Sequence, residues 1–250
     1  MIHIYSAAEP FFFSGNKDIA ILFIHGFTAS PSEVYPVAKL VHQTSGATVS
    51  GVLLPGHGSH PRFLNRTTWR DWYSTVESES KYLLANYEKV YVVGLSLGGL
   101  LAMYLGGNIP ELKGGVAINP PIRLHYDKLL NFLAPLVQWI KPYIPKPVGN
   151  QEKLRKKGRF AYDSTPVKAF RSMMEFRKRT LGVLDDYNDM PLLLIQSQKD
   201  ETVNPKGVEL VLSKVKNIEL VELEDSEHVA TMGKEKKEIA SLIIDFIGKN

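Results

Sequence analysis

The feature that most constrains this chain is a serine held between two glycines. Residues 94–98 read Gly-Leu-Ser-Leu-Gly and follow the apolar run 90–93. A serine raised clear of the end of a strand must sit on a sharp strand-to-helix bend, and glycines two positions before and after it leave room for that bend. The preceding run suits a buried strand, and residues 97–105 suit the following helix. This context indicates that Ser96 is the nucleophile of a hydrolase rather than a hydroxyl in an ordinary loop.

A serine hydroxyl is a weak nucleophile at neutral pH and needs a base to take its proton. On a strand-turn-helix of this kind the three catalytic residues follow one another as Ser, then Asp or Glu, then His. Of the seven histidines only His125 and His228 follow Ser96, and His125 precedes every plausible acid, including Asp127, and lies in the predicted cap. We therefore predict that His228, just after the alternating run 218–223, is the base.

The carboxylate that orients the base is chosen by its place relative to a strand. Asp200 lies in the polar loop that leaves the apolar run 191–195, at the carboxyl end of a predicted strand. Three other aspartates precede that strand and would lie at its opposite end: Asp185, Asp186 and Asp189. Asp200 is the predicted acid, and Asp225, close to His228 but on the next strand, is the reserve candidate.

An acyl-transfer site also needs two backbone N–H groups for the negative charge that develops on the carbonyl oxygen. The residue after the nucleophile, Leu97, is the first predicted donor. The second should come from the turn after the predicted strand 19–24. There Gly26 permits the bend, the Phe27 N–H is the predicted donor, and His25 is interpreted as a structural residue that holds the loop.

The order of elements favours an α/β fold with a mostly parallel sheet covered by helices on both faces. Short apolar runs that suit strands alternate with apolar residues repeating every three to four positions, as in helices. Ser30 and Glu33, with Pro31 between them, have the spacing of a capping box at the start of the first helix. The predicted strands, beyond those named above, are 48–54 and 116–118, and the predicted helices include 34–41, 69–76, 208–215 and 239–246.

A long connection interrupts this alternation just before the strand that carries the acid. Residues 121–188 are more than a link between two strands needs, so we predict a core formed by 1–120 and 189–250 with a cap inserted at 121–188. Apolar residues in 129–144 cover more than one helical face. They either line a pocket for an acyl chain or are buried within the cap, and the sequence leaves both readings open.

The predicted cap is basic. It holds 14 Lys and Arg against 6 Asp and Glu, whereas the whole chain has a net charge of only +4. The cluster within 153–159 either forms an ordinary solvated face, which we favour, or makes weak contact with an anionic lipid surface. No nucleic-acid-binding motif accompanies the pI of about 9.0, so we expect no nucleic-acid partner.

Composition limits the chemistry further. There are no cysteines, which excludes disulfides and thiolate metal sites, and no histidine-carboxylate spacing suggests zinc. We therefore expect no metal and no cofactor. No apolar run is long enough to span a bilayer, and the first residues lack the pattern of a secretion signal, so a cytoplasmic enzyme is expected.

These motifs together resemble the bacterial carboxylesterases and monoacylglycerol lipases of the α/β-hydrolase superfamily. The resemblance spans nearly the whole chain and is strongest at 25–31, 54–58, 94–99, the Asp200 loop, His228 and 162–166. It implies an α/β-hydrolase fold with a small helical cap, acting on short- to medium-chain esters or monoacylglycerols. One departure is that Gly233 and Lys234 stand where relatives often carry an acidic residue, which we expect to affect packing rather than chemistry.

The sequence thus predicts a two-step acyl transfer through Ser96, His228 and Asp200, with the Phe27 and Leu97 amides stabilising the oxyanion. A haloalkane dehalogenase is disfavoured because it carries an aspartate in place of Ser96. Thioesterase, amidase and carbon–carbon hydrolase activities use the same triad and remain open. So does a non-catalytic ligand-binding module on the same scaffold, and neither the natural substrate nor the oligomeric state can be read from the sequence.

Overall fold

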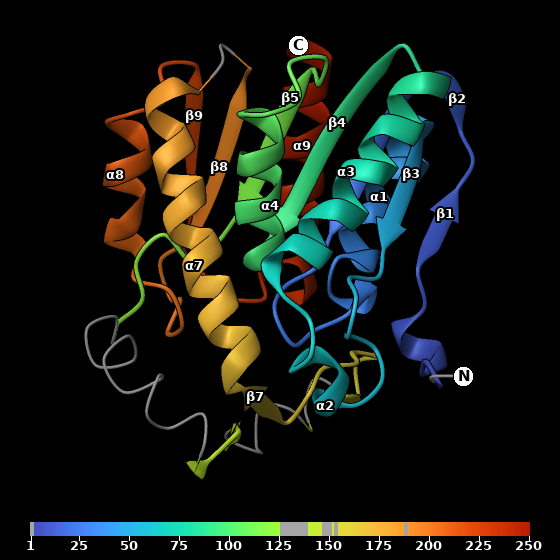
Figure 1. Ribbon diagram of the computed structural model, residues 1–250. Helices are drawn as coiled ribbons and strands as arrows, with labels where there is room; N and C mark the ends of the chain where they lie inside the picture. The colour runs from blue at the N-terminus through green and yellow to red at the C-terminus, as the bar shows by residue number, and fades with distance from the viewer. Residues whose placement is uncertain (1–2, 126–139, 147–151, 153–154, 188–189) are drawn as a thin grey trace.

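The computed structural model describes residues 3–125, 140–146, 152, 155–187 and 190–250. Their centre is a seven-stranded sheet in the order β1-β3-β2-β4-β5-β8-β9 (Figure 1). β1 runs antiparallel to β3, and every other neighbouring pair in this sheet is parallel. The strands are β1 Phe11–Phe13, β2 Asn16–Ile24, β3 Ala47–Val52, β4 Lys89–Leu95, β5 Gly114–Ile118, β8 Leu192–Ser197 and β9 Ile218–Leu223. The predicted mostly parallel α/β fold is confirmed.

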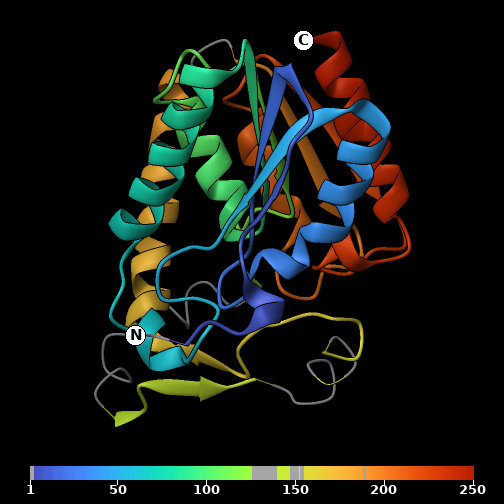
Figure 2. The ribbon, with the colours of Figure 1, turned by 90° about the vertical axis from the view of Figure 1, so that its right-hand side faces the viewer.

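Helices cover both faces of this sheet (Figure 2). One face carries α3 Trp69–Asn86, α4 Leu97–Gly106, α7 Val167–Val183 and α8 Val208–Leu212, and the other carries α1 Tyr35–Ser45 and α9 Lys236–Lys249. A short helix, α2 Pro61–Leu64, follows β3. Single 3₁₀ turns complete the helical segments: η1 Ser6–Ala8, η2 Pro31–Glu33, η3 Leu184–Asp186, η4 Pro205–Gly207 and η5 Ala230–Met232.

The central strands are mostly apolar, as is required of strands that are buried on both faces. Every residue of β3, β5 and β8 is buried, as expected for parallel strands between two helical layers. Successive side chains of a strand point to opposite faces. Accordingly, Leu22 and Ile24 of β2 belong to the apolar cluster under α3 and α4, whereas Ile21 and Phe23 belong to the cluster under α1 and α9.

The predicted capping box at Ser30 and Glu33 is wrong. The chain forms the turn η2 there, and α1 begins only at Tyr35, without a side-chain cap from Ser30. Ser30 Oγ instead donates a hydrogen bond to the Phe160 carbonyl (2.9 Å), and the Glu33 carboxylate pairs with Arg159. Both side chains are thus bound to a distant segment rather than to the helix end.

The described parts of the predicted cap include a second, two-stranded sheet of β6 Tyr143–Pro145 and β7 Ser164–Pro166. Helix α7 follows β7, and four of its buried residues belong to the same apolar cluster as residues of α3 and α4: Ala169, Met173, Met174 and Phe176. The apolar positions at 129–139 lie outside the described residues. The predicted division into core and cap therefore stays a prediction.

Candidate active site

Ser96 occupies the sharp bend between β4 and α4. Its backbone angles are φ 55° and ψ −117°, a conformation that L-residues rarely adopt. The bend leaves no room for side chains on either flank. A Cβ at Gly94 would lie 1.9 Å from the Gly98 carbonyl oxygen, and one at Gly98 would lie 2.1 Å from the Ile24 carbonyl oxygen. The two glycines are therefore a steric requirement of the serine's position.

The three residues predicted as nucleophile, base and acid come together in space. His228 Nε2 lies 3.0 Å from Ser96 Oγ, and His228 Nδ1 lies 2.7 Å from Asp200 Oδ2. A carboxylate accepts hydrogen bonds, so it favours the tautomer that carries its proton on Nδ1. In that tautomer the Nε2 lone pair faces the serine hydroxyl, as proton transfer requires.

The Asp200 carboxylate is buried and fully engaged. Its Oδ2 faces His228, while its Oδ1 accepts hydrogen bonds from the backbone N–H groups of Thr202 and Val203, both at 2.8 Å. These donors hold the carboxylate in one orientation. The reserve candidate, Asp225, is instead exposed and paired with Lys199 at the surface.

The predicted oxyanion loop lies against the serine. A Cβ at Gly26 would be 3.4 Å from Ser96 Cβ, which places the turn after β2 directly beside Ser96. Among the residues that the structure describes, neither the Phe27 nor the Leu97 amide donates a hydrogen bond to another backbone or side-chain group. Both predicted donors are therefore free to receive a developing oxyanion.

Two buried histidines brace this loop. His25 Nδ1 donates to the Gly26 carbonyl (2.8 Å), and its Nε2 accepts from the Leu54 N–H (3.1 Å). His57 Nε2 accepts from the Thr28 N–H (3.2 Å). Burial lowers the pKa of His25 to about 4 and holds the pKa of His57 well below its usual value, so both rings are neutral at pH 7. His25 is thus structural, as expected.

A segment from the far side of the predicted cap, 159–166, is bonded to the same loops. The Tyr162 N–H donates to the Thr28 carbonyl (2.8 Å), and the Tyr162 hydroxyl donates to the Gly56 carbonyl (2.7 Å). The same hydroxyl accepts from the Ser59 N–H (3.1 Å). One tyrosine therefore joins the predicted oxyanion loop to the loop after β3.

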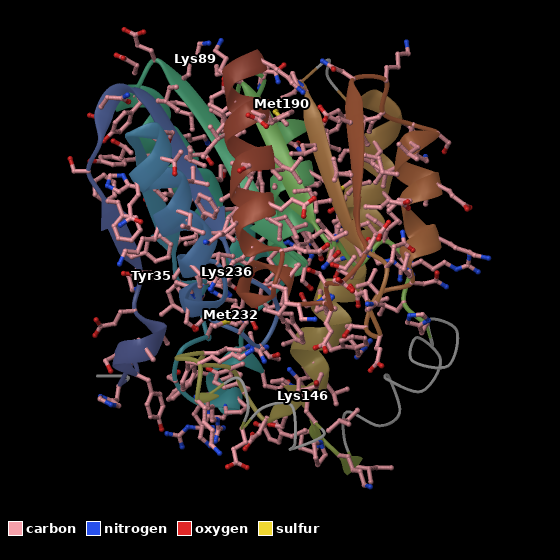
Figure 3. All side chains as sticks on the ribbon, turned by 180° about the vertical axis from the view of Figure 1, so that it is seen from behind. Tyr35, Lys89, Lys146, Met190, Met232 and Lys236 are labelled. Atoms are coloured by element: carbon pink, nitrogen blue, oxygen red, sulfur yellow. The ribbon has the colours of Figure 1, made fainter. Side chains whose placement is uncertain are left out.

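Buried charged side chains add further contacts between these distant segments of the chain. Arg159 pairs with the buried Glu33 carboxylate, so this member of the predicted basic cluster is no surface charge. Lys146 Nζ donates to Thr28 Oγ1, and burial, the largest influence, lowers the pKa of Lys146 to about 8. Figure 3 places Lys146 at the opposite end of the molecule from Lys89 and Met190, which stand at the amino ends of β4 and β8.

Sequence reasoning did not find the roles of His57 and Lys146. His57 belongs to the stretch 54–58 that carried the family resemblance, but nothing in the residue pattern showed what it contacts. Lys146 stands in a proline-rich stretch with no motif of its own. Both act through partners far away in the sequence, which only the folded chain brings together.

A cavity of about 410 Å³ is lined in part by the segment 159–166. Tyr5, Phe160 and Tyr162 form aromatic walls, and His60 and Asp163 also line it. Ser96, Asp200 and His228 are not among its described lining residues.

Within the described ranges, no cluster of three or more His, Cys, Asp or Glu side chains is arranged to hold a metal ion. In that part of the chain, no helix combines the length and apolar character needed to cross a membrane.

The chain is similar to a known protein family and to several known proteins over most of its length. The family described as "Alpha/beta hydrolase family" matches residues 21–241. A thermostable monoacylglycerol lipase from Bacillus sp. (strain H-257) is 29% identical over 248 residues, covering 98% of this chain and 96% of that protein. A carboxylesterase from Bacillus subtilis (strain 168) is 26% identical, covering 96% of each chain. A solved structure reported for the metagenome-derived lipolytic enzymes LipS and LipT superposes with a TM-score of 0.88 at 28% identity, covering 99% of this chain and 100% of that one.

Proposed function

This chain belongs to the alpha/beta hydrolase family, and we propose that it is a carboxylic ester hydrolase working through Ser96, His228 and Asp200. The observation that carries the proposal is the chain of two hydrogen bonds from Ser96 Oγ through the imidazole to the buried carboxylate, 3.0 and 2.7 Å long. The similarity to proteins named monoacylglycerol lipase and carboxylesterase supports the same chemistry.

The first step forms an acyl-enzyme. His228 Nε2 takes the proton of Ser96 Oγ while this oxygen attacks the ester carbonyl. The carbonyl oxygen becomes an oxyanion, which receives hydrogen bonds from the Phe27 and Leu97 amides. As the tetrahedral intermediate collapses, His228 gives the proton to the departing alcohol. The Asp200 carboxylate stabilises the imidazolium throughout.

The second step releases the acid. A water molecule takes the place of the alcohol, loses its proton to His228 Nε2 and attacks the acyl carbonyl. The same two amides stabilise the second tetrahedral intermediate. Its collapse breaks the bond to Ser96 Oγ, which recovers its proton from His228. The carboxylic acid leaves and the enzyme returns to its starting state.

The substrates we propose are short- to medium-chain esters or monoacylglycerols. Each methylene buried in an apolar acyl site contributes about 0.8 kcal/mol, so four additional carbons favour a substrate by about 3 kcal/mol. Acyl length then dominates selectivity over the alcohol group. Rates on p-nitrophenyl esters from acetyl to dodecanoyl, beside monoacylglycerols of the same acids, measure this dependence. Equal kcat/KM along the series would contradict it.

Substitution of the proposed triad tests the mechanism. Ser96→Ala and His228→Ala should each lower kcat by at least ~10³-fold, and the double variant should be no worse, because the two groups act as one unit. Asp200→Asn should also lower kcat strongly, by favouring the wrong tautomer of His228. Asp225→Asn is the matched control, since its carboxylate is exposed and paired with Lys199, and should keep the wild-type kcat.

Two further results would overturn the proposal. Failure of a phosphonate probe to label Ser96 would exclude a serine nucleophile. It would favour a non-catalytic ligand-binding module. A kcat/KM for a thioester or an amide that exceeds that for the oxygen ester of the same acid would assign the triad to a different reaction.

A further inference from the structure

Asn119 occupies the junction between the strands that carry the active site. It directly follows β5, is completely buried and has a left-handed backbone with φ 46°. Its N–H donates to the Ile195 carbonyl in β8 (2.9 Å). The preceding residue, Ile118, accepts a hydrogen bond from the Ser96 N–H (2.8 Å). The backbone at this position therefore touches both the bend that holds the nucleophile and the strand that leads to Asp200.

The side chain of Asn119 adds a bond to the third member of the site. Its Oδ1 accepts from the Ser197 N–H (2.7 Å), and its Nδ2 donates to the His228 carbonyl (2.9 Å) and to Ser197 Oγ (2.9 Å). A main-chain N–H can only donate and a main-chain carbonyl can only accept, so these two partners fix the orientation of the carboxamide. A carboxylate or an apolar side chain cannot serve both.

The bond to His228 has no substitute nearby. Among the residues that the structure describes, no other side chain donates a hydrogen bond to the His228 carbonyl. The imidazole must stay within hydrogen-bond reach of both Ser96 and Asp200, and its position follows from where the backbone of residue 228 is held. A displacement of about 1 Å in a catalytic group costs on the order of 10²-fold in rate.

We propose that Asn119 is a positioning residue for His228. Its carboxamide fastens the loop that carries the base to the strand that leads to the acid, and so sets the distance between the imidazole and Ser96. It acts through His228 and does not touch the substrate. This inference rests on the proposed function, because it assigns to His228 the role of catalytic base.

Asn119→Asp is the sharpest test. The replacement has nearly the same shape and keeps an acceptor for the Ser197 N–H, but turns a carboxylate oxygen toward the His228 carbonyl. We expect kcat to fall by ~30- to 100-fold with KM unchanged, as for a misplaced catalytic group. Asn119→Ala removes the bond without adding a charge and should lower kcat by ~10-fold or more. If Asn119→Asp does not fold, the kcat of Asn119→Ala provides the test.

Two control variants separate positioning from general stability. Ser197→Ala removes the hydroxyl that Asn119 Nδ2 also contacts but leaves the bond to His228, and should keep kcat near the wild-type value. Ile243→Ala opens a cavity in the apolar cluster under α9 and should lower the melting temperature without changing kcat. The low-field proton resonance of His228 Nδ1–H should shift or broaden in the Asn119 variants and stay in place in both controls.

The outcomes are distinct. Wild-type kcat in folded Asn119→Ala, or a loss in Ser197→Ala as large as in Asn119→Ala, would overturn the positioning role while leaving the esterase proposal intact. A wild-type protein without esterase activity would instead refute the proposed function. A rise in KM with unchanged kcat would also overturn the inference, because it would place Asn119 in substrate binding.

Discussion

Two loops meet at Ser96, and they are held in place by different forces. The bend at 94–98 is held by close packing, because Gly94 and Gly98 lie against main-chain atoms that leave no space for a Cβ. The proposed oxyanion loop at 25–28 is held by hydrogen bonds of His25, His57, Lys146 and Tyr162. The position of the proposed nucleophile therefore depends on close packing, and the position of the proposed oxyanion donor depends on polar contacts.

This difference has consequences for how each loop responds to change. Packing does not titrate, so pH leaves the bend unaffected, while a single added methyl group disrupts it. Buried polar contacts respond in the opposite way. They tolerate small changes of volume but depend on the protonation state of every partner. The two halves of one active site should therefore fail under different perturbations.

The largest effect is expected at the bend. In Gly98→Ala the new Cβ would lie 2.1 Å from the Ile24 carbonyl oxygen, a main-chain atom of the central strand, so the bend must open. We expect a loss of more than ~4 kcal/mol of unfolding free energy and of esterase activity. Urea denaturation and the hydrolysis rate measure both.

Gly182→Ala is the matched control for that change. It makes the same substitution in α7, where nothing lies within 4 Å of the added Cβ. It should raise stability by ~0.5–1 kcal/mol through better helix propensity. If Gly98→Ala were as stable as the wild type, packing would not be what fixes the bend.

The next largest effect is a loss of folding stability in acid, which we expect to arise in the oxyanion loop and not in the bend. The pKa of His25 falls from 6.5 in the unfolded chain to about 4 in the fold, so on acidification the unfolded chain takes up the proton first. The corresponding stability is complete above pH 6.5 and is lost as the pH falls toward 4. It amounts to about 3 kcal/mol for His25, and His57 adds to it in the same direction. Urea midpoints between pH 7 and pH 4 measure the slope.

His57→Gln tests the assignment of that slope. The glutamine cannot titrate and offers its carbonyl oxygen to the Thr28 N–H. Stability should fall less steeply with acidification in this variant than in the wild type, whatever its value at pH 7. Identical slopes would mean that the acid sensitivity arises elsewhere in the molecule.

The smallest effect is expected for the buried ion pair between Arg159 and Glu33. Arg159→Met leaves the buried Glu33 carboxylate without its partner. Breaking such a pair usually costs ~3–5 kcal/mol, and we expect about 2 kcal/mol because Lys146 still faces the carboxylate. The double variant Glu33→Gln with Arg159→Met should lose less than Arg159→Met alone. Thermal and urea denaturation give the comparison.

An exposed pair provides the reference for this result. Lys81→Met breaks the surface pair with Glu77 on α3 and should change stability by no more than ~0.5 kcal/mol. A cost for Arg159→Met as small as that for Lys81→Met would show that the Glu33 carboxylate is solvated. The pair between Arg159 and Glu33 would then contribute little to the position of the loop at 25–28.

Much of the fold was predictable because local patterns of apolar residues indicate where its strands and helices lie. The run 218–223 was predicted as a strand and is β9 Ile218–Leu223, and the helix expected after Ser96 is α4. Chain order and strand ends also sufficed to choose Asp200 over Asp225. The structure brings Asp200 within 2.7 Å of His228 Nδ1 and leaves Asp225 at the surface, while the catalytic roles remain proposals.

What the sequence did not reveal depends on contacts between distant segments. Ser30 and Glu33 have the spacing of a capping box, but residues 159–160, more than a hundred positions away, bind both side chains. Asn119 likewise carries no motif, because its partners Ser197 and His228 approach it only in the folded sheet. Local periodicity therefore predicts the helices and strands. Side-chain contacts between residues far apart in the sequence determine how the site residues are positioned.

The bonds made by Tyr162 have a consequence for hybrid enzymes. Its backbone and its hydroxyl reach Thr28, Gly56 and Ser59, which lie in two loops outside the predicted insertion. A chimera that receives residues 121–188 from a relative keeps the contacts to Gly56 and Ser59 only when the donor supplies a matching tyrosine. The recipient loops and the graft must therefore be exchanged together if substrate preference is to be transferred without loss of turnover.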